Sequence, residues 1–206
     1  MMNKKEIILK SMDNVVAIYR DVGNVAQAIE QQVIANGYKA YGDAALTWEN
    51  STAYYGCESW LNRWFARVYF KQIKGEHNHR AVGYCIHLGG YSEENVNMMQ
   101  AYGLKLPLIT MSAMELETEV SKCYRLHLYD ILWQAGWKEK QAIKIGKLAE
   151  SKISWGGVTA STSTIAVNLL DLQGSADIEA FVVKNLMSLY ETGNFVGSGT
   201  GLLPIG

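Results

Sequence analysis

Hydrophobic residues recur at alternating spacings of four and three along the first part of the chain. They are Ile8, Met12, Val15, Tyr19, Val22, Ala26, Ile29 and Val33. This spacing places all eight side chains on one face of an α-helix, so the sequence predicts a single long helix over residues 4–36. Asn36 and Gly37 tolerate the left-handed backbone that ends many helices. Gly23 costs roughly 1 kcal/mol relative to alanine, which makes a break near residues 21–24 the alternative.

Beyond this helix, the apolar runs become short and are separated by turn residues, which is typical of strands. Strands are expected over residues 45–49, 67–73, 81–88 and 106–110, with a hairpin loop over 74–80 and short helices over 58–64 and 92–102. Residues 114–133 fit both a helix and a strand, and we favour a strand over 123–133. Residues 154–164 consist almost wholly of small residues and predict a loop.

The last third of the chain adds one strand and one helix to this prediction. A mostly apolar run predicts a strand over residues 163–172. A final helix is expected from Ser175 to Gly193, because Asp177 and Glu179 suit the first turn of a helix and apolar residues follow at helical spacing.

These elements predict an α+β fold. Strands do not alternate regularly with crossover helices, so we expect a mostly antiparallel sheet of about five or six strands. The sheet is packed against the long N-terminal helix and the C-terminal helix, which together cover one face. We expect a single globular domain over residues 1–206, with a flexible Gly-rich tail over 194–206.

Composition narrows the classes of function. Of the 206 residues, 49% are hydrophobic and 19% are charged, as in a packed globular protein. Nineteen basic and twenty acidic residues leave a net charge of −1, so general attraction to nucleic acid or an anionic membrane is not expected. Cys57, Cys85 and Cys123 form no C-x-x-C pair, and no apolar run reaches the length of a membrane span. We therefore expect a cytoplasmic protein.

Three residues are weak candidates for catalysis. Cys85 and His87 lie two residues apart on a predicted strand, so they share a face and have the chemistry of a nucleophile and a base. His127 completes such a site only if its predicted strand lies next to theirs. The alternative is that Cys85 is a small core residue and that a neighbour hydrogen-bonds His87. His77 and His79 fit a solvated turn, so the sequence predicts no metal site and no cofactor.

The strongest candidate for a ligand site follows a lysine-rich segment. An aromatic face there stands beside small residues whose amides a phosphate can approach. The candidate ligand-binding residues are Lys147, Trp155, Gly156, Gly157, Thr159 and Ser161. No P-loop spacing supports them, and a solvated lysine face leading into an ordinary loop is the alternative. The exposure of Trp155 distinguishes the ligand site from the ordinary loop, because a stacking residue is exposed and a core residue is buried.

Two functional hypotheses follow. The first is a cytosolic binding or interaction protein without assembled catalytic machinery, which forms a homodimer through its N-terminal helix if the seam exceeds what the sheet covers. The second is a small hydrolase or transferase acting on a phosphorylated or nucleotide-like ligand, with His87 or His127 as acid or base. The second requires His87, His127 and the 156–163 segment to converge on one pocket.

Overall fold

The structure, a computed structural model, describes residues 3–42, 46–48, 64–71, 78–88, 107–137 and 148–196. Its helices are α1 (Lys4–Ala35), α3 (Arg125–Trp137), α4 (Ser175–Asp177) and α5 (Lys184–Thr192), with a π-helical segment Ile178–Val183 and 3-10 turns Val120–Lys122 and Leu169–Asp171. Its strands are β1 (Lys39–Ala40), β2 (Leu46–Trp48), β3 (Trp64–Phe70), β4 (Arg80–His87), β5 (Leu108–Leu116), β6 (Ala149–Trp155) and β7 (Val158–Asn168).

The first helix is confirmed as one unbroken element. Asn3 caps its first turn, because its side chain accepts a hydrogen bond from the Glu6 amide while the Glu6 carboxylate accepts one from the Asn3 amide. Asn36 caps the end, and Gly37 follows with a positive φ of 84°. Gly23 lies inside the helix without breaking it.

Among the described residues, every pairing in the sheet is antiparallel, as the sequence predicts. The order is β1-β3-β4-β5-β7-β6, and β2 pairs with β3 as well, so the described part of the chain contributes seven strands to the sheet. The longest pairing runs along β5 and β7, from Leu108 opposite Asn168 to Leu116 opposite Ala160. The two ends of this pairing are therefore about 26 Å apart at roughly 3.3 Å per residue.

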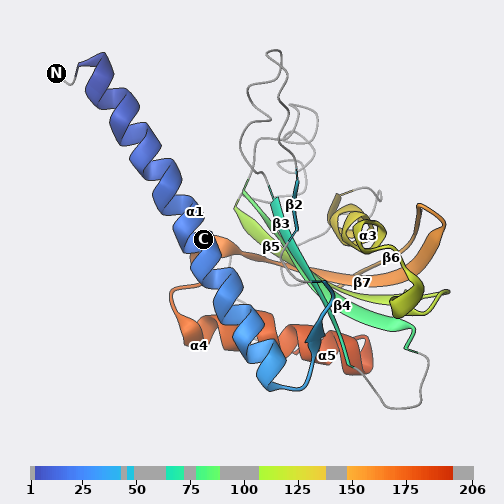
Figure 1. The fold of residues 1–206 in the computed structure, drawn as a ribbon. Coiled ribbons are helices and arrows are strands. Elements are labelled where there is room, and N and C mark those ends of the chain that lie inside the picture. The colour runs from blue at the N-terminus through green and yellow to red at the C-terminus, as the bar shows by residue number, and fades with distance from the viewer. Residues whose placement is uncertain are drawn as a thin grey trace.

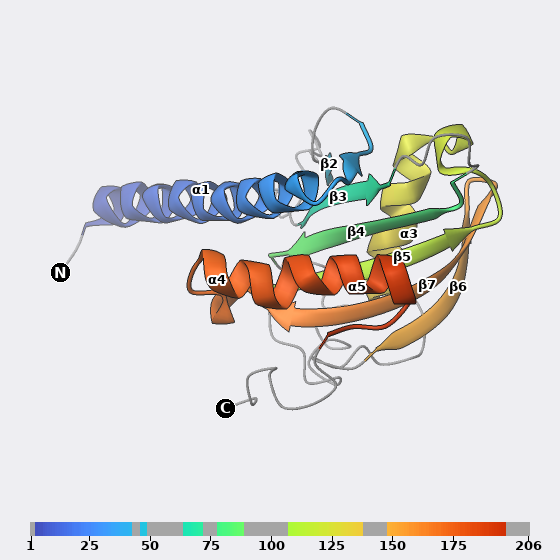
Figure 2. The ribbon, with the colours of Figure 1, turned by 90° about the horizontal axis from the view of Figure 1, so that it is seen from below.

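Helices cover both faces of the sheet, as the two views together show (Figure 1, Figure 2). The second half of α1 and the segment from α4 to α5 cover one face, where Val22, Ile29 and Val33 join a core with the C-terminal helix. On the other face, α3 buries Leu128, Leu132 and their neighbours against β3, β4 and β5. The expectation that helices cover one face is thus correct for the first and last helices but omits α3.

The prediction of a strand over residues 123–133 is wrong, because most of this segment belongs to α3. Its buried residues fall at helical rather than alternating spacing: Leu128, Tyr129, Ile131, Leu132 and Ala135. Gly83 on β4 lets the helix approach, since a Cβ there would lie 2.9 Å from Leu132 Cδ2 and 2.5 Å from the Arg67 carbonyl oxygen.

The prediction of a loop over residues 154–164 is also wrong. The segment forms the end of β6, a tight turn at Gly156 and Gly157, and most of β7. Ser151 and Thr162, and likewise Ser154 and Thr159, pair their hydroxyls across the two strands at 2.7 and 2.8 Å.

The C-terminal helix is confirmed over residues 175–192, and Gly193 ends it with a φ of 71°. The other expected elements, over residues 58–63, 72–77, 92–102 and 197–206, lie outside the described residues.

Candidate functional site

The most conspicuous surface feature is the first half of α1, residues 4–21, which we call the exposed half. It extends away from the sheet, with the N-terminus at its far end (Figure 1, Figure 2). Six of its large apolar side chains keep about half of their surface in solvent. They are Ile7 (49%), Ile8 (53%), Leu9 (55%), Met12 (59%), Val16 (53%) and Ile18 (51%).

The exposed half carries the same apolar seam as the packed half. Ile8 and Ile29 occupy the same heptad position three heptads apart, yet Ile29 is fully buried and Ile8 is exposed. Tyr19 lies at the boundary, where its ring meets Phe65 of β3 edge-on with centroids 5.8 Å apart. Beyond this contact toward the N-terminus, the seam is half-buried at Val15 and exposed at Met12 and Ile8.

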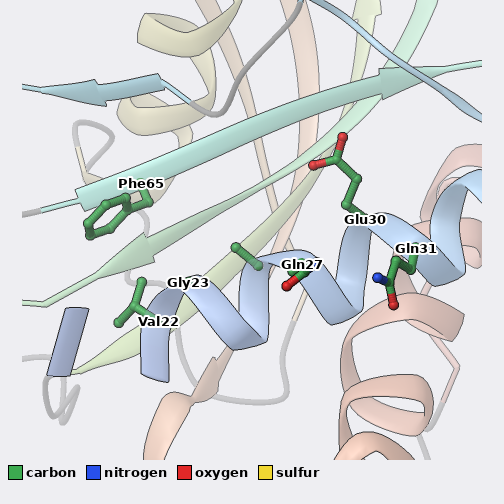
Figure 3. Close-up of a pocket in the computed structure, with 7 residues that line it drawn as sticks. Val22, Gly23, Gln27, Glu30, Gln31 and Phe65 are labelled. Atoms are coloured by element: carbon green, nitrogen blue, oxygen red, sulfur yellow. The ribbon is translucent and has the colours of Figure 1, made fainter. Parts of the chain in front are cut away.

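A pocket of about 540 Å³ lies where the exposed half meets the sheet. We call it the Gly23 pocket (Figure 3), and it is lined by Val22, Gly23, Ala26, Gln27, Glu30, Gln31 and Phe65. A Cβ on Gly23 would meet nothing within 4 Å, so this residue opens the pocket along the side of α1. The pocket therefore combines an apolar floor with the carboxylate of Glu30 at one end.

Glu30 is held by a buried partner. Its carboxylate lies 2.7 Å from Arg67 Nη2, and Arg67 also donates a 3.1 Å hydrogen bond to the Gly42 carbonyl. Burial by itself lowers the pKa of the Arg67 guanidinium, but the hydrogen bond and charge of Glu30 raise that pKa above its usual value. The ion pair therefore anchors α1 to β3 through Glu30, which also lines the Gly23 pocket.

The candidate catalytic residues Cys85 and His87 share a face of β4, as predicted, with Cys85 Sγ and His87 Nδ1 3.9 Å apart. Both side chains are fully buried. Burial raises the pKa of the Cys85 thiol well above its usual value and lowers that of His87 to about 3, and His87 Nε2 lies 3.0 Å from Thr110 Oγ1. This geometry supplies neither a thiolate nor an opening for a substrate.

The turn at Gly156 meets α3 rather than β4. The imidazole of His127 lies against Gly156 so closely that a Cβ there would be 2.3 Å from Nε2. Tyr124, an exposed residue, contacts the same imidazole edge-on with ring centroids 5.2 Å apart. Trp155 is 43% exposed. Burial raises the pKa of Asp130, while a hydrogen bond from Trp155 and the nearby His127 partly oppose that rise.

The remaining candidate ligand residues do not join this group. Thr159 and Ser161 alternate with Val158 and Ala160, which pack under α3, so their side chains lie on the opposite face of β7. Lys147 lies outside the described residues. His87 pairs with Leu108 at the far end of β5, so it does not converge with His127 and the Gly156 turn.

The sequence analysis did not identify Glu30, Phe65, Tyr124 or Asp130 as site residues. Tyr124 and Asp130 stand three residues to either side of His127, a helical spacing that is missed when the segment is read as a strand. Glu30 follows Gly23 by one heptad, which places both on one flank of α1. That spacing was the available signal for the pocket.

Comparisons with models of protein families, with curated proteins and with solved structures find no match for this chain. No helix in the described part of the chain has the length and apolarity needed to cross a membrane. Among the same residues, no three His, Cys, Asp or Glu side chains are grouped so that they would hold a metal ion.

Proposed function

We propose that this chain is an interaction protein that self-associates through the exposed half of α1. The observation that carries the proposal is the continuity of the seam, which runs from a fully buried Ile29 to an exposed Ile8 without a change in spacing. If α1 only covered its own sheet, apolar residues beyond the edge of the sheet would bury no surface. A contiguous exposed apolar surface of this kind is typical of an interaction site.

The expected gain is comparable to the cost of association. Burying a large apolar side chain contributes about 1.5–3 kcal/mol, and side chains that are already half-buried contribute roughly half of that. Five of these side chains on each protomer, all except Ile7, would offset an association cost of about 4–15 kcal/mol without greatly exceeding it. We therefore expect an equilibrium between monomer and dimer at micromolar concentrations.

Sedimentation velocity over a range of concentrations tests this proposal. The wild-type chain should sediment increasingly as a dimer up to tens of micromolar. Met12→Asp places a charge in the seam and should give a monomer. Asn14→Asp adds the same charge two residues away on the opposite side of α1, and should still dimerise. A wild-type chain that stays monomeric at these concentrations would refute the proposal.

An amphipathic helix can also bind a membrane surface. The basic residues of the exposed half are nearly balanced by Glu6, Asp13 and Asp21, which favours a protein partner over anionic lipid. Co-sedimentation with vesicles of phosphatidylcholine and phosphatidylserine distinguishes the two. Binding to vesicles by a monomeric wild-type chain would replace the proposal with a membrane function.

The contacts around Trp155 do not favour the hydrolase or transferase hypothesis. The carboxylate of Asp130 lies next to the exposed indole, where it would repel a phosphate. The hydroxyl of Thr159 is paired with Ser154 on the other face of the hairpin. The exposed rings of Trp155 and Tyr124 are instead compatible with a second contact surface of an interaction protein.

A further inference from the structure

We infer that the two copies pair in antiparallel orientation, so that the N-terminal end of each α1 reaches the Gly23 pocket of the other copy. This inference rests on the proposed self-association and specifies its geometry. The occupant of the pocket is then the first turn of the partner's α1.

The sheet excludes the parallel arrangement. Val22, Ile29 and Val33 continue the seam of the exposed half, but each copy covers them with its own sheet and C-terminal helix. Because α1 is one continuous helix, two copies aligned in parallel along residues 4–21 would stay side by side beyond residue 22. There each helix would collide with the other copy's sheet. In the antiparallel arrangement, each helix instead continues past the other copy's N-terminus into open space.

Helix length and the spacing of the seam together set the register. The exposed half has roughly 18 residues and is about 27 Å long at 1.5 Å per residue. A partner helix begins at Lys4 and can cover the seam as far as the Gly23 pocket. Pairing the seam residues across the axis, with Met12 of one copy opposite Val15 of the other, places Lys4 opposite Gly23. A two-fold axis near residues 13 and 14 repeats each contact.

Gly23 and Glu30 suit this arrangement. The missing side chain at Gly23 leaves open space beside α1 where a second helix can approach closely. The arriving end of the partner carries Lys4 and Lys5, and the pocket that it meets is lined by Glu30, whose carboxylate also pairs with Arg67. In a parallel pair, by contrast, the two copies of Lys4 and Lys5 would lie side by side. Opposed helix dipoles also favour the antiparallel orientation.

Disulfide trapping distinguishes the orientations. Leu9 and Val16 are both exposed, apolar and located on one flank of the seam, one heptad apart. In the antiparallel register, Leu9 of one copy is displaced by only about 3 Å along the axis from Val16 of the other. Two copies of Leu9 are about 13.5 Å apart along the axis and two copies of Val16 about 7.5 Å, to which the distance between the helices is added, so neither pair is within reach of a disulfide. The background protein carries Cys57→Ser; Cys85 and Cys123 are retained because both are buried.

The experiment mixes Leu9→Cys with Val16→Cys and oxidises the mixture at micromolar concentration. On a non-reducing gel, the mixture should shift from the 23.0 kDa monomer to twice that mass, while each variant alone remains at the monomer position. The matched control is Lys10→Cys mixed with Ala17→Cys, which has the same spacing on the opposite face and should not shift.

Each other outcome overturns the inference. Cross-linking of each variant with itself, without a mixed product, would indicate parallel pairing. A dimer in sedimentation that yields no seam cross-link, or that cross-links equally at the control sites, would place the interface elsewhere. These results leave self-association intact, whereas a monomer in sedimentation refutes the proposed function itself.

Discussion

The two halves of α1 have the same pattern of residues but opposite environments. Residues 22–35 bury their seam against the sheet and the C-terminal helix, whereas residues 4–21 present an equivalent seam to solvent. Hydrophobic periodicity therefore specifies that a face will be buried, but not by what. The partner of each half is decided by where the sheet ends, which depends on the register of β3 with its neighbours.

The pair Ile29→Ala and Ile8→Ala tests this comparison most directly, because residue type, helix and heptad position are matched. Ile29 is fully buried, so Ile29→Ala should lower the free energy of unfolding by about 2–5 kcal/mol. Ile8→Ala should leave the unfolding free energy of the monomer nearly unchanged, since it leaves no cavity. Urea denaturation at submicromolar concentration measures both.

Sedimentation of the same two variants completes the test. Ile8→Ala should weaken the dimer, while Ile29→Ala should leave the dimerisation constant of the folded chain unchanged. A large loss of monomer stability in Ile8→Ala would mean that the exposed half is packed against its own chain, and the contrast between the halves would disappear.

The sequence predicted the parts of the fold in which local pattern and tertiary environment agree. The length of α1 follows from its seam, and the C-terminal helix from its apolar spacing. The sequence failed at α3, where Tyr124 and Leu126 alternate with polar residues over a short stretch although the burial is helical from Leu128 onward. It also failed at β7, whose alternation is carried by Thr and Ala rather than by large apolar residues.

The interaction surface could be predicted only in part for the same reason. The seam was visible in the sequence, and with it the hypothesis of a homodimer. Its exposed portion was not visible, because the boundary near Tyr19 is set by contacts with Phe65, which is distant in the chain. The Gly23 pocket also depends on β3, so the glycine alone indicated only a weak point in a helix.

Removal of the Glu30 carboxylate tests what holds the packed half in place. Glu30→Ala leaves Arg67 buried and without its carboxylate, and breaking a buried ion pair costs about 3–5 kcal/mol. We expect a loss near 3 kcal/mol, the lower end, because Glu30 keeps 32% of its side chain exposed. Thermal or urea denaturation measures it, and Asp13→Ala on the outer face of the exposed half is the control. Equal losses in the two variants would contradict the anchoring role.

Lowering the pH should destabilise the folded chain through His87, which lies in the sheet. The exposed half of α1 contains no histidine. Burial lowers the pKa of His87 to about 3, against an ordinary value of 6.5, so the folded state holds this imidazole neutral. Below pH 6.5 the unfolded chain binds a proton that the folded chain does not, and stability falls as pH decreases toward 3. The slope from this residue approaches about 1.4 kcal/mol per pH unit. His87→Gln should lose this slope; an unchanged slope would show that His87 is protonated in the folded state.

The smallest expected effect is also the most specific, because Gly23→Ala should move stability and association in opposite directions. Glycine inside a helix costs about 0.5–1 kcal/mol relative to alanine, and the added Cβ meets nothing within 4 Å, so the monomer should become more stable by that amount. The same methyl group projects into the pocket that receives the partner's first turn, so the dimer should dissociate at lower concentration. Ala17→Gly, on the outer face of the exposed half, is the control for helix stability, because it changes propensity without entering the pocket. If Gly23→Ala instead strengthens association, helix stability governs the interface. The inference that a second helix approaches closely at Gly23 would then be wrong.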